Sequence, residues 1–154
     1  TLHTHMYEGA AAQLEAHRGA PVLNLAEADY NLLLWEDPNV QCVQGLSRYF
    51  LVDDEQAYGD IHVIKDAKQT DRAKLEALAR FARRGVTLVA AHRTRIAGTP
   101  TSAERLALAY PGVLERTFTT RAPVGSARAA SLFSLHADRL EGCLGADDLA
   151  GGAE

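Results

Sequence analysis

Residues 70–91 place a helix directly before a buried strand, and this succession constrains the fold more than any other part of the sequence. Thr70 or Asp71 can cap a helix whose apolar residues recur at helical spacing, namely Leu75, Leu78, Ala79 and Ala82. Gly85 stands where a helix ends in a left-handed residue, and residues 86–91 then form a largely apolar run. Such a run is typical of a strand buried on both faces, so the segment predicts a sheet covered by helices.

The remaining periodicities extend this pattern along the chain. The predicted elements are helices over 7–18 and 25–36, strands over 40–44, 48–52 and 61–64, a helix over 101–109, a strand over 113–118 and a helix over 126–140. The polar residues 53–60 are interpreted as the turn of an antiparallel hairpin. We therefore expect an α/β fold with a mixed central sheet, made of an antiparallel hairpin plus β-α-β crossovers, flanked by helices in a single domain.

Length and composition bound the organisation of the chain. Its 154 residues fit one domain, and we expect residues 1–6 to be a vector remnant or disordered start, 7–145 the domain and 146–154 a flexible tail. No apolar run approaches the roughly 18 residues that cross a bilayer. Two cysteines are too few for a disulfide framework, so we expect a cytoplasmic protein with no membrane contact.

Asp66 and Lys68 are the strongest candidates for chemistry, because we expect them at the end of the second hairpin strand. Side chains two residues apart on a strand point to the same face. A carboxylate beside a lysine can hold a divalent cation while the lysine positions a water, and further acids would complete a magnesium site. The alternative is an exposed acid–lysine pair that contributes little to stability.

The surroundings of this pair follow a recognisable order. Glu27 lies in a helix that runs into LLLWEDPNV (32–40), and the strands RYFLV (48–52) and IHVI (61–64) come before Asp66-Ala67-Lys68. In this order, and with the helix and strand that follow to about His92, the chain resembles the PD-(D/E)xK nuclease fold, and most of all the N-terminal domain of TnsA-type transposon endonucleases. The resemblance implies DNA cleavage with Mg²⁺ and catalytic roles for Glu27, Asp66 and Lys68.

The first hairpin strand departs from the family's pattern. The position of the family's aspartate is occupied by Tyr49, which the expected register places opposite Asp66. Tyrosine is a poor ligand for Mg²⁺, so the candidate metal ligands are Glu27, Asp66 and, nearer the turn, Asp53. Glu27 also has capping-box spacing from Asn24, which gives it a structural alternative.

Arginines are crowded between residues 72 and 95. For contact with nucleic acid we single out Arg72, Arg93 and Arg95, the last two beside His92 at a sheet edge where ligands tend to bind in α/β folds. The net charge of −4 disfavours indiscriminate adhesion to nucleic acid but permits a local basic face. The alternative is that these charges are the solvated sides of a helix and a loop.

Three functional hypotheses follow. The first is a nuclease-like protein that acts on DNA, as a Mg²⁺-dependent endonuclease with an incomplete metal site. The second is a non-catalytic DNA- or protein-binding module on the same fold, which Tyr49 and the acidic net charge favour. The third is a small hydrolase that uses His3 and His5 with His92.

Overall fold

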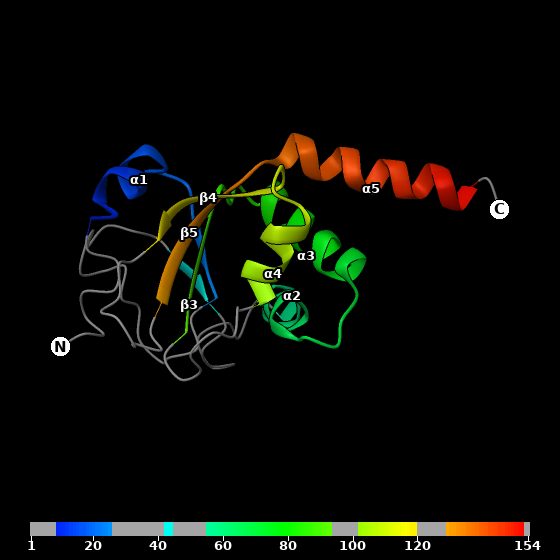
Figure 1. The fold of residues 1–154 in the computed structure, drawn as a ribbon, viewed down its shortest axis with the longest axis horizontal. Coiled ribbons are helices and arrows are strands. Elements are labelled where there is room, and N and C mark those ends of the chain that lie inside the picture. The colour runs from blue at the N-terminus through cyan, green and yellow to red at the C-terminus, as the bar shows by residue number, and fades with distance from the viewer. Residues whose placement is uncertain (1–8, 26–41, 45–54, 94–101, 120–128, 153–154) are drawn as a thin grey trace.

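The computed structural model describes residues 9–25, 42–44, 55–93, 102–119 and 129–152 of the chain. Its helices are α1 (Ala11–Ala16), α2 (Glu55–Lys65), α3 (Asp71–Arg83), α4 (Ser102–Ala109) and α5 (Ala137–Gly152). Its strands are β1 (Val22–Asn24), β2 (Cys42–Gln44), β3 (Leu88–Arg93), β4 (Leu114–Thr119) and β5 (Ala129–Leu135). Figure 1 shows a sheet with helices on both sides.

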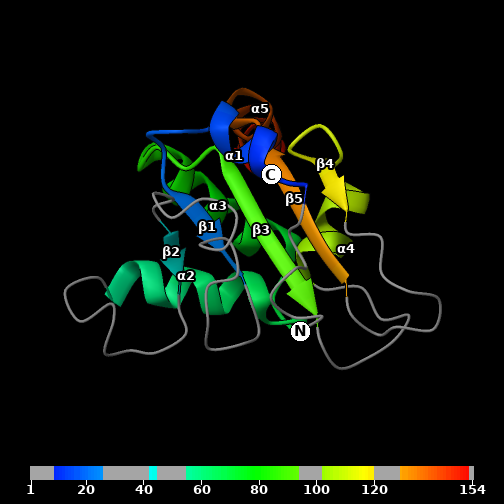
Figure 2. The ribbon, with the colours of Figure 1, turned by 90° about the vertical axis from the view of Figure 1, so that its left-hand side faces the viewer.

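The described strands form one mixed sheet in the order β2-β1-β3-β5-β4. β1 pairs in parallel with β2 and β3, whereas β5 runs antiparallel to both β3 and β4. β4 is therefore parallel to β3. The carboxyl ends of β1, β2, β3 and β4 thus lie at one edge of the sheet together with the start of β5, and we call this edge the carboxyl edge (Figure 2).

The two faces of β3 are buried against different helices. Val89 and Ala91 belong to a core cluster with residues of α2, α3, α4 and α5. Leu88 and Ala90 point to the opposite face and join a second cluster with Leu14 of α1. Figure 1 shows the same division, with α1 on one side of the sheet and α2, α3 and α4 on the other. Burial on both faces explains why the sequence of β3 does not alternate between apolar and polar residues.

α3 begins and ends where its sequence predicts. The Thr70 hydroxyl accepts a hydrogen bond of 3.1 Å from the amide of Ala73, which satisfies one of the free amides of the first turn. At the other end Gly85 has a φ of +94°, a conformation that costs glycine little. The amide of Val86 then donates to the carbonyl of Phe81, and the chain turns directly into β3.

The predicted fold class is confirmed. The strands expected over 40–44, 86–91 and 113–118 correspond to β2, β3 and β4, and the helices predicted after Thr70 and over 101–109 correspond to α3 and α4. Apart from Leu25, the helix predicted over 25–36 lies outside the described residues, as does the strand over 48–52. Within the described part of the chain, no helix combines the length and the apolar character that a bilayer crossing requires.

The strand predicted over 61–64, and with it the expected hairpin turn, is wrong. Residues 55–65 form α2, because the buried positions Ala57, Asp60, Ile61 and Ile64 recur at helical spacing and face the core cluster. The β-branched residues of this stretch favour a strand only by intrinsic propensity, which tertiary packing overrides. The antiparallel hairpin of the fold is instead formed by β4 and β5.

The helix predicted over 126–140 is also wrong. β5 occupies Ala129–Leu135, and since it lies between β3 and β4 its residues 131, 132, 133 and 135 are all buried. Such burial removes the alternation that identifies a strand. α5 starts after His136 and continues to Gly152. β1, with three residues, went unpredicted.

α1 is held against the sheet by two polar contacts around the buried Leu14. The side-chain amide of Gln13 donates to the carbonyl of Thr117 on β4 at 3.3 Å. His17 Nδ1 lies 2.7 Å from the hydroxyl oxygen of Thr87, just before β3. Burial lowers the pKa of His17 below its usual value of 6.5, so the folded state disfavours the protonated ring.

A depressed histidine pKa makes stability fall with acidification. Below pH 6.5 the unfolded chain takes up the His17 proton more readily than the folded chain, so folded-state stability is lost as pH falls towards the folded-state pKa. We expect the melting temperature of His17→Asn to fall less than that of the wild type when the pH is lowered from about 8 to about 5. Thermal unfolding monitored by circular dichroism checks this, with His62→Asn, at an exposed site on α2, as control. Equal losses in wild type and His17→Asn would contradict the assignment.

Candidate functional site

The structure separates the predicted site residues. Asp66 and Lys68 lie in the connection between α2 and α3, rather than at a strand end. Arg72 is in the first turn of α3, whereas Arg93 is the last residue of β3, so these two residues belong to different layers. The other three predicted residues lie outside the described residues: Glu27, Asp53 and Arg95.

Asp66 and Lys68 form a local turn. The Asp66 carboxylate accepts a hydrogen bond of 2.9 Å from the backbone amide of Lys68, and both residues are exposed. A side-chain oxygen that binds the amide two residues on is the signature of an Asx turn. The connection lies on the outer side of the helical layer, away from the sheet (Figure 1). Among the described residues, no group of three or more His, Cys, Asp or Glu side chains could hold a metal ion.

The turn geometry predicts a small structural role for Asp66. We expect Asp66→Ala to lower the free energy of unfolding by about 0.5–1.5 kcal/mol, since one exposed hydrogen bond is removed. We also expect purified wild type and Asp66→Ala to leave supercoiled plasmid equally intact in Mg²⁺. Nicking by the wild type that disappears in Asp66→Ala would instead support the endonuclease hypothesis and its catalytic assignment of Asp66.

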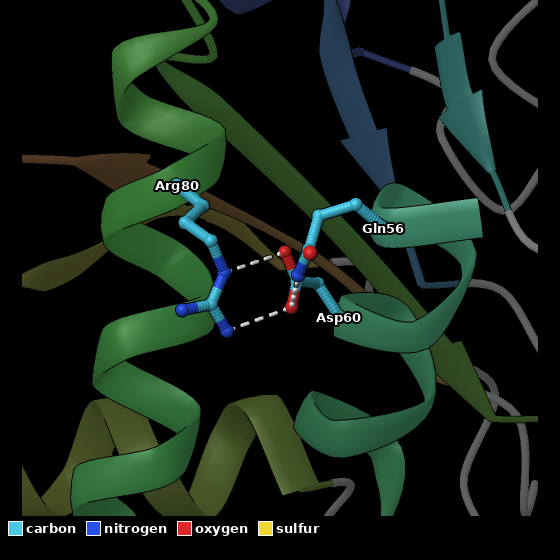
Figure 3. Close-up of polar contacts among 3 residues, drawn as sticks. All are labelled: Gln56, Asp60 and Arg80. Carbon is cyan, nitrogen blue, oxygen red and sulfur yellow. Dashed lines mark hydrogen bonds and ion pairs between the residues drawn. The ribbon is translucent and has the colours of Figure 1, made fainter. Parts of the chain in front are cut away.

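The best-defined polar cluster joins α2 to α3. Arg80 donates two hydrogen bonds to the buried Asp60, from Nε to Oδ2 at 2.9 Å and from Nη2 to Oδ1 at 2.8 Å (Figure 3). Gln56, one turn before Asp60, donates to Oδ1 at 3.1 Å (Figure 3). Both carboxylate oxygens therefore have donors, which a buried carboxylate requires. The hydrogen bond to Asp60 raises the pKa of Arg80, with burial acting in the opposite direction.

This pairing also changes the interpretation of the arginine-rich stretch. Arg80 is held by Asp60, and Arg72 forms a 3.1 Å ion pair with Glu76 on the next turn of α3. Lys74, between them in sequence, is buried. Two of the three arginines of α3 are therefore paired with acids of the helical layer. Sequence spacing could have indicated the Arg72–Glu76 pair, but not the pair between Asp60 and Arg80, which are 20 residues apart.

Loss of Arg80 should destabilise the protein because it leaves the Asp60 carboxylate buried without its main partner. We expect Arg80→Ala to lower the free energy of unfolding by about 1–3 kcal/mol, a range that allows for the 40% exposure of the arginine side chain. Arg72→Ala, which removes an exposed pair on the same helix, should cost at most about 0.5 kcal/mol. Urea denaturation measures both values. Equal losses of unfolding free energy in the two variants would contradict a larger contribution from the Asp60–Arg80 pair.

The carboxyl edge has the arrangement at which open α/β sheets bind ligands. The connection after β1 leads to β2 on one side, whereas the chain after β3 leads to β4 and β5 on the other, so β1 and β3 meet at a topological switch point. The amide of Leu25 donates to the carbonyl of Ala90 at 2.7 Å, where β1 ends. β3 continues for three more residues to Arg93, which pairs in register with Ala129 of β5.

Arginines cluster in the sequence around this edge. Residues 94–101, which follow β3, and residues 120–128, which connect β4 to β5, contain Arg95, Arg121 and Arg128 and no Asp or Glu. Arg128 directly precedes Ala129 in the sequence, and Ala129 pairs in register with Arg93. Sequence reasoning did not single out Arg121 or Arg128, because it placed Arg128 in a helix predicted over 126–140 and assigned no element to Arg121, which follows the strand predicted over 113–118.

No protein-family model matches the chain, and comparisons with curated proteins and with solved structures found no match either. The resemblance of residues 27–68 to PD-(D/E)xK nucleases therefore stays a prediction from the sequence. The roles of Glu27, Asp53 and Arg95, which lie outside the described residues, stay predictions in the same way.

Proposed function

We propose that this chain is a non-catalytic DNA-binding module that contacts phosphates at the carboxyl edge, on the side of β3, β5 and β4. The observation that carries the proposal is the sheet register, which sets Arg93 opposite Ala129, the residue that follows Arg128 in the sequence. Arg95 and Arg121 follow within two residues of the ends of β3 and β4. Arginine is the preferred side chain for phosphate because its planar fork donates two hydrogen bonds.

The local charge supports phosphate contact near β3, β5 and β4, although the chain as a whole has a net charge of −4. The segments that leave β3 and β4 at the carboxyl edge contain arginine as their only charged residue type. The residues that follow β1 and β2 (26–41 and 45–54) contain six acids and one arginine. A field that is positive at one side of an edge and negative at the other would orient a polyanion rather than adhere to it at random.

The placement of Asp66 and Lys68 supports binding without cleavage. These residues belong to the outer connection between α2 and α3, whereas Arg93 ends β3 at the carboxyl edge. Cleavage would require the carboxylate, the lysine and a metal within contact of the same phosphate. The Mg²⁺-dependent endonuclease is therefore the second candidate function. Binding that does not change with salt would instead indicate a protein partner.

Removal of the edge arginines should weaken binding and its salt dependence together. We expect the wild type to bind a short DNA duplex with an affinity that falls linearly in log[salt] between about 50 and 200 mM. Arg93→Gln with Arg128→Gln should reduce the steepness of that line by about one unit for each phosphate that the variant no longer neutralises. Fluorescence anisotropy of labelled DNA gives both quantities.

A matched double variant controls for net charge. Arg105→Gln with Arg139→Gln removes two exposed arginines from α4 and α5 and should leave affinity and salt slope close to wild type. Equal weakening by both double variants would indicate adhesion through overall charge and would contradict an edge site. Undetectable DNA binding at the lowest salt would overturn the proposal itself.

A further inference from the structure

α1 is weakly stabilised by its own sequence. It is six residues long, its N-cap residue Ala10 offers no side-chain acceptor to the first turn, and neither an acid near its start nor a base near its end complements the helix dipole. A helix as short as this one does not persist alone in water, because nucleation costs more than its few hydrogen bonds return. α1 is therefore helical because it packs on the sheet.

The contact between α1 and the sheet is small. Leu14 is the one buried residue of the helix itself, and its N-cap Ala10 is also buried. The other buried members of the second core cluster belong to strands, namely Val22, Leu88, Ala90 and Leu132. Among the labelled helices of Figure 1, α1 alone lies on this side of the sheet. In this cluster, α1 and its N-cap thus contribute two apolar side chains.

One of the polar contacts of α1 is incomplete. The side-chain amide of Gln13 donates to the carbonyl of Thr117, but its Oε1 is buried and no described residue donates a hydrogen bond to it. A buried acceptor without a donor costs free energy, and that cost disappears when the acceptor reaches water. The other contact, between His17 and Thr87, is exposed. The polar contacts therefore hold α1 less firmly than a fully paired set would.

Two glycines with a positive φ flank α1. Gly9 and Gly19 both have a φ of +89°, a conformation that residues with a Cβ rarely adopt. A Cβ at Gly19 would meet no atom within 4 Å, and one at Gly9 would lie 3.8 Å from the ring of Phe118, an ordinary contact. Packing therefore does not require glycine at either position, whereas the backbone conformation does. Residues that absorb large changes of φ and ψ at the ends of an element are the usual hinges of moving segments.

We propose that residues 9–19 form a strap, which opens as one unit about its two glycines while the sheet and the helical layer stay folded. In the closed state the strap covers Leu88, Ala90 and Leu132, and in the open state this apolar part of β3 and β5 loses that cover. The helical layer can stay in place because its core cluster lies on the other face of the sheet. The proposal does not depend on DNA binding, because it concerns a face of the sheet rather than the carboxyl edge.

Hydrogen exchange measured by NMR tests the strap residue by residue. The amides of Leu14 and His17 donate within α1 and its caps, whereas those of Leu25 and Leu135 donate to carbonyls in or next to β3. We expect the α1 amides to be protected at least about tenfold less than the sheet amides, since an open strap loses its helix while the sheet keeps its hydrogen bonds. Equal protection would show that α1 opens only when the whole sheet unfolds, and would overturn the proposal.

Two alanine variants at positive-φ glycines distinguish a strap from a part of the common core. Gly19→Ala penalises the closed strap and should speed exchange at Leu14 by at least about fivefold. Gly85→Ala imposes the same kind of penalty between α3 and β3, outside the strap. It should speed exchange at Leu135 by a similar factor but leave Leu14 within about twofold of its wild-type rate, because an open strap retains the strain at residue 85.

The contrary results are distinct. Equal acceleration at Leu14 and Leu135 in Gly85→Ala would show that both amides exchange through the same global unfolding, and would overturn the proposal. An unchanged rate at Leu14 in Gly19→Ala would overturn the assignment of this glycine as a hinge. If Gly85→Ala does not fold, Leu140→Ala, which weakens the core cluster on the other face of the sheet, takes its place with the same expectations.

Discussion

The burial of β3 on both faces is the constraint on which the rest of the structure depends. Val89 and Ala91 require the layer of helices on one side, and Leu88 and Ala90 require α1 on the other. The same strand joins the parallel part of the sheet, through β1, to the antiparallel part, through β5. A polar substitution on either face would therefore disturb the core cluster on that face and the strand that joins both halves of the sheet, because burying an unpaired polar group costs free energy in an apolar interior.

Within the helical layer, the Asp60–Arg80 pair holds α2 against α3. α2 and α3 are neighbours joined by a short connection, and the pair ties the middle of α2 to the last turn of α3 (Figure 3). The same pair removes Arg80 from the surface charge that the sequence suggests. Positive charge on a helix is thus a poor guide to a binding face until its partners are known.

An element could be predicted from the sequence where its buried residues recur with the period of a helix or a strand. α3 and β3 could be predicted because a cap, a helical stripe and Gly85 occur in the order that the backbone needs. α2 could not, because Ile61, Val63 and Ile64 favour a strand locally, and only their packing against the core decides for a helix. β5 lacked alternation because it is covered on both faces. The predicted site was affected most, because Asp66 and Lys68 were expected to share one face at the end of the strand predicted over 61–64. That segment belongs to α2.

The position of β5 has a consequence for the order in which the sheet can be completed. β5 is the last strand in the chain, yet it lies between β3 and β4, and among the described strands it is the only partner of β4. On a growing chain, the parallel strands β1, β2 and β3 can pair as soon as Arg93 has been made. β4 has no place in the sheet until residues 129–135 follow, so a nascent chain that ends between these points carries an unpaired strand whose backbone groups are open to other chains.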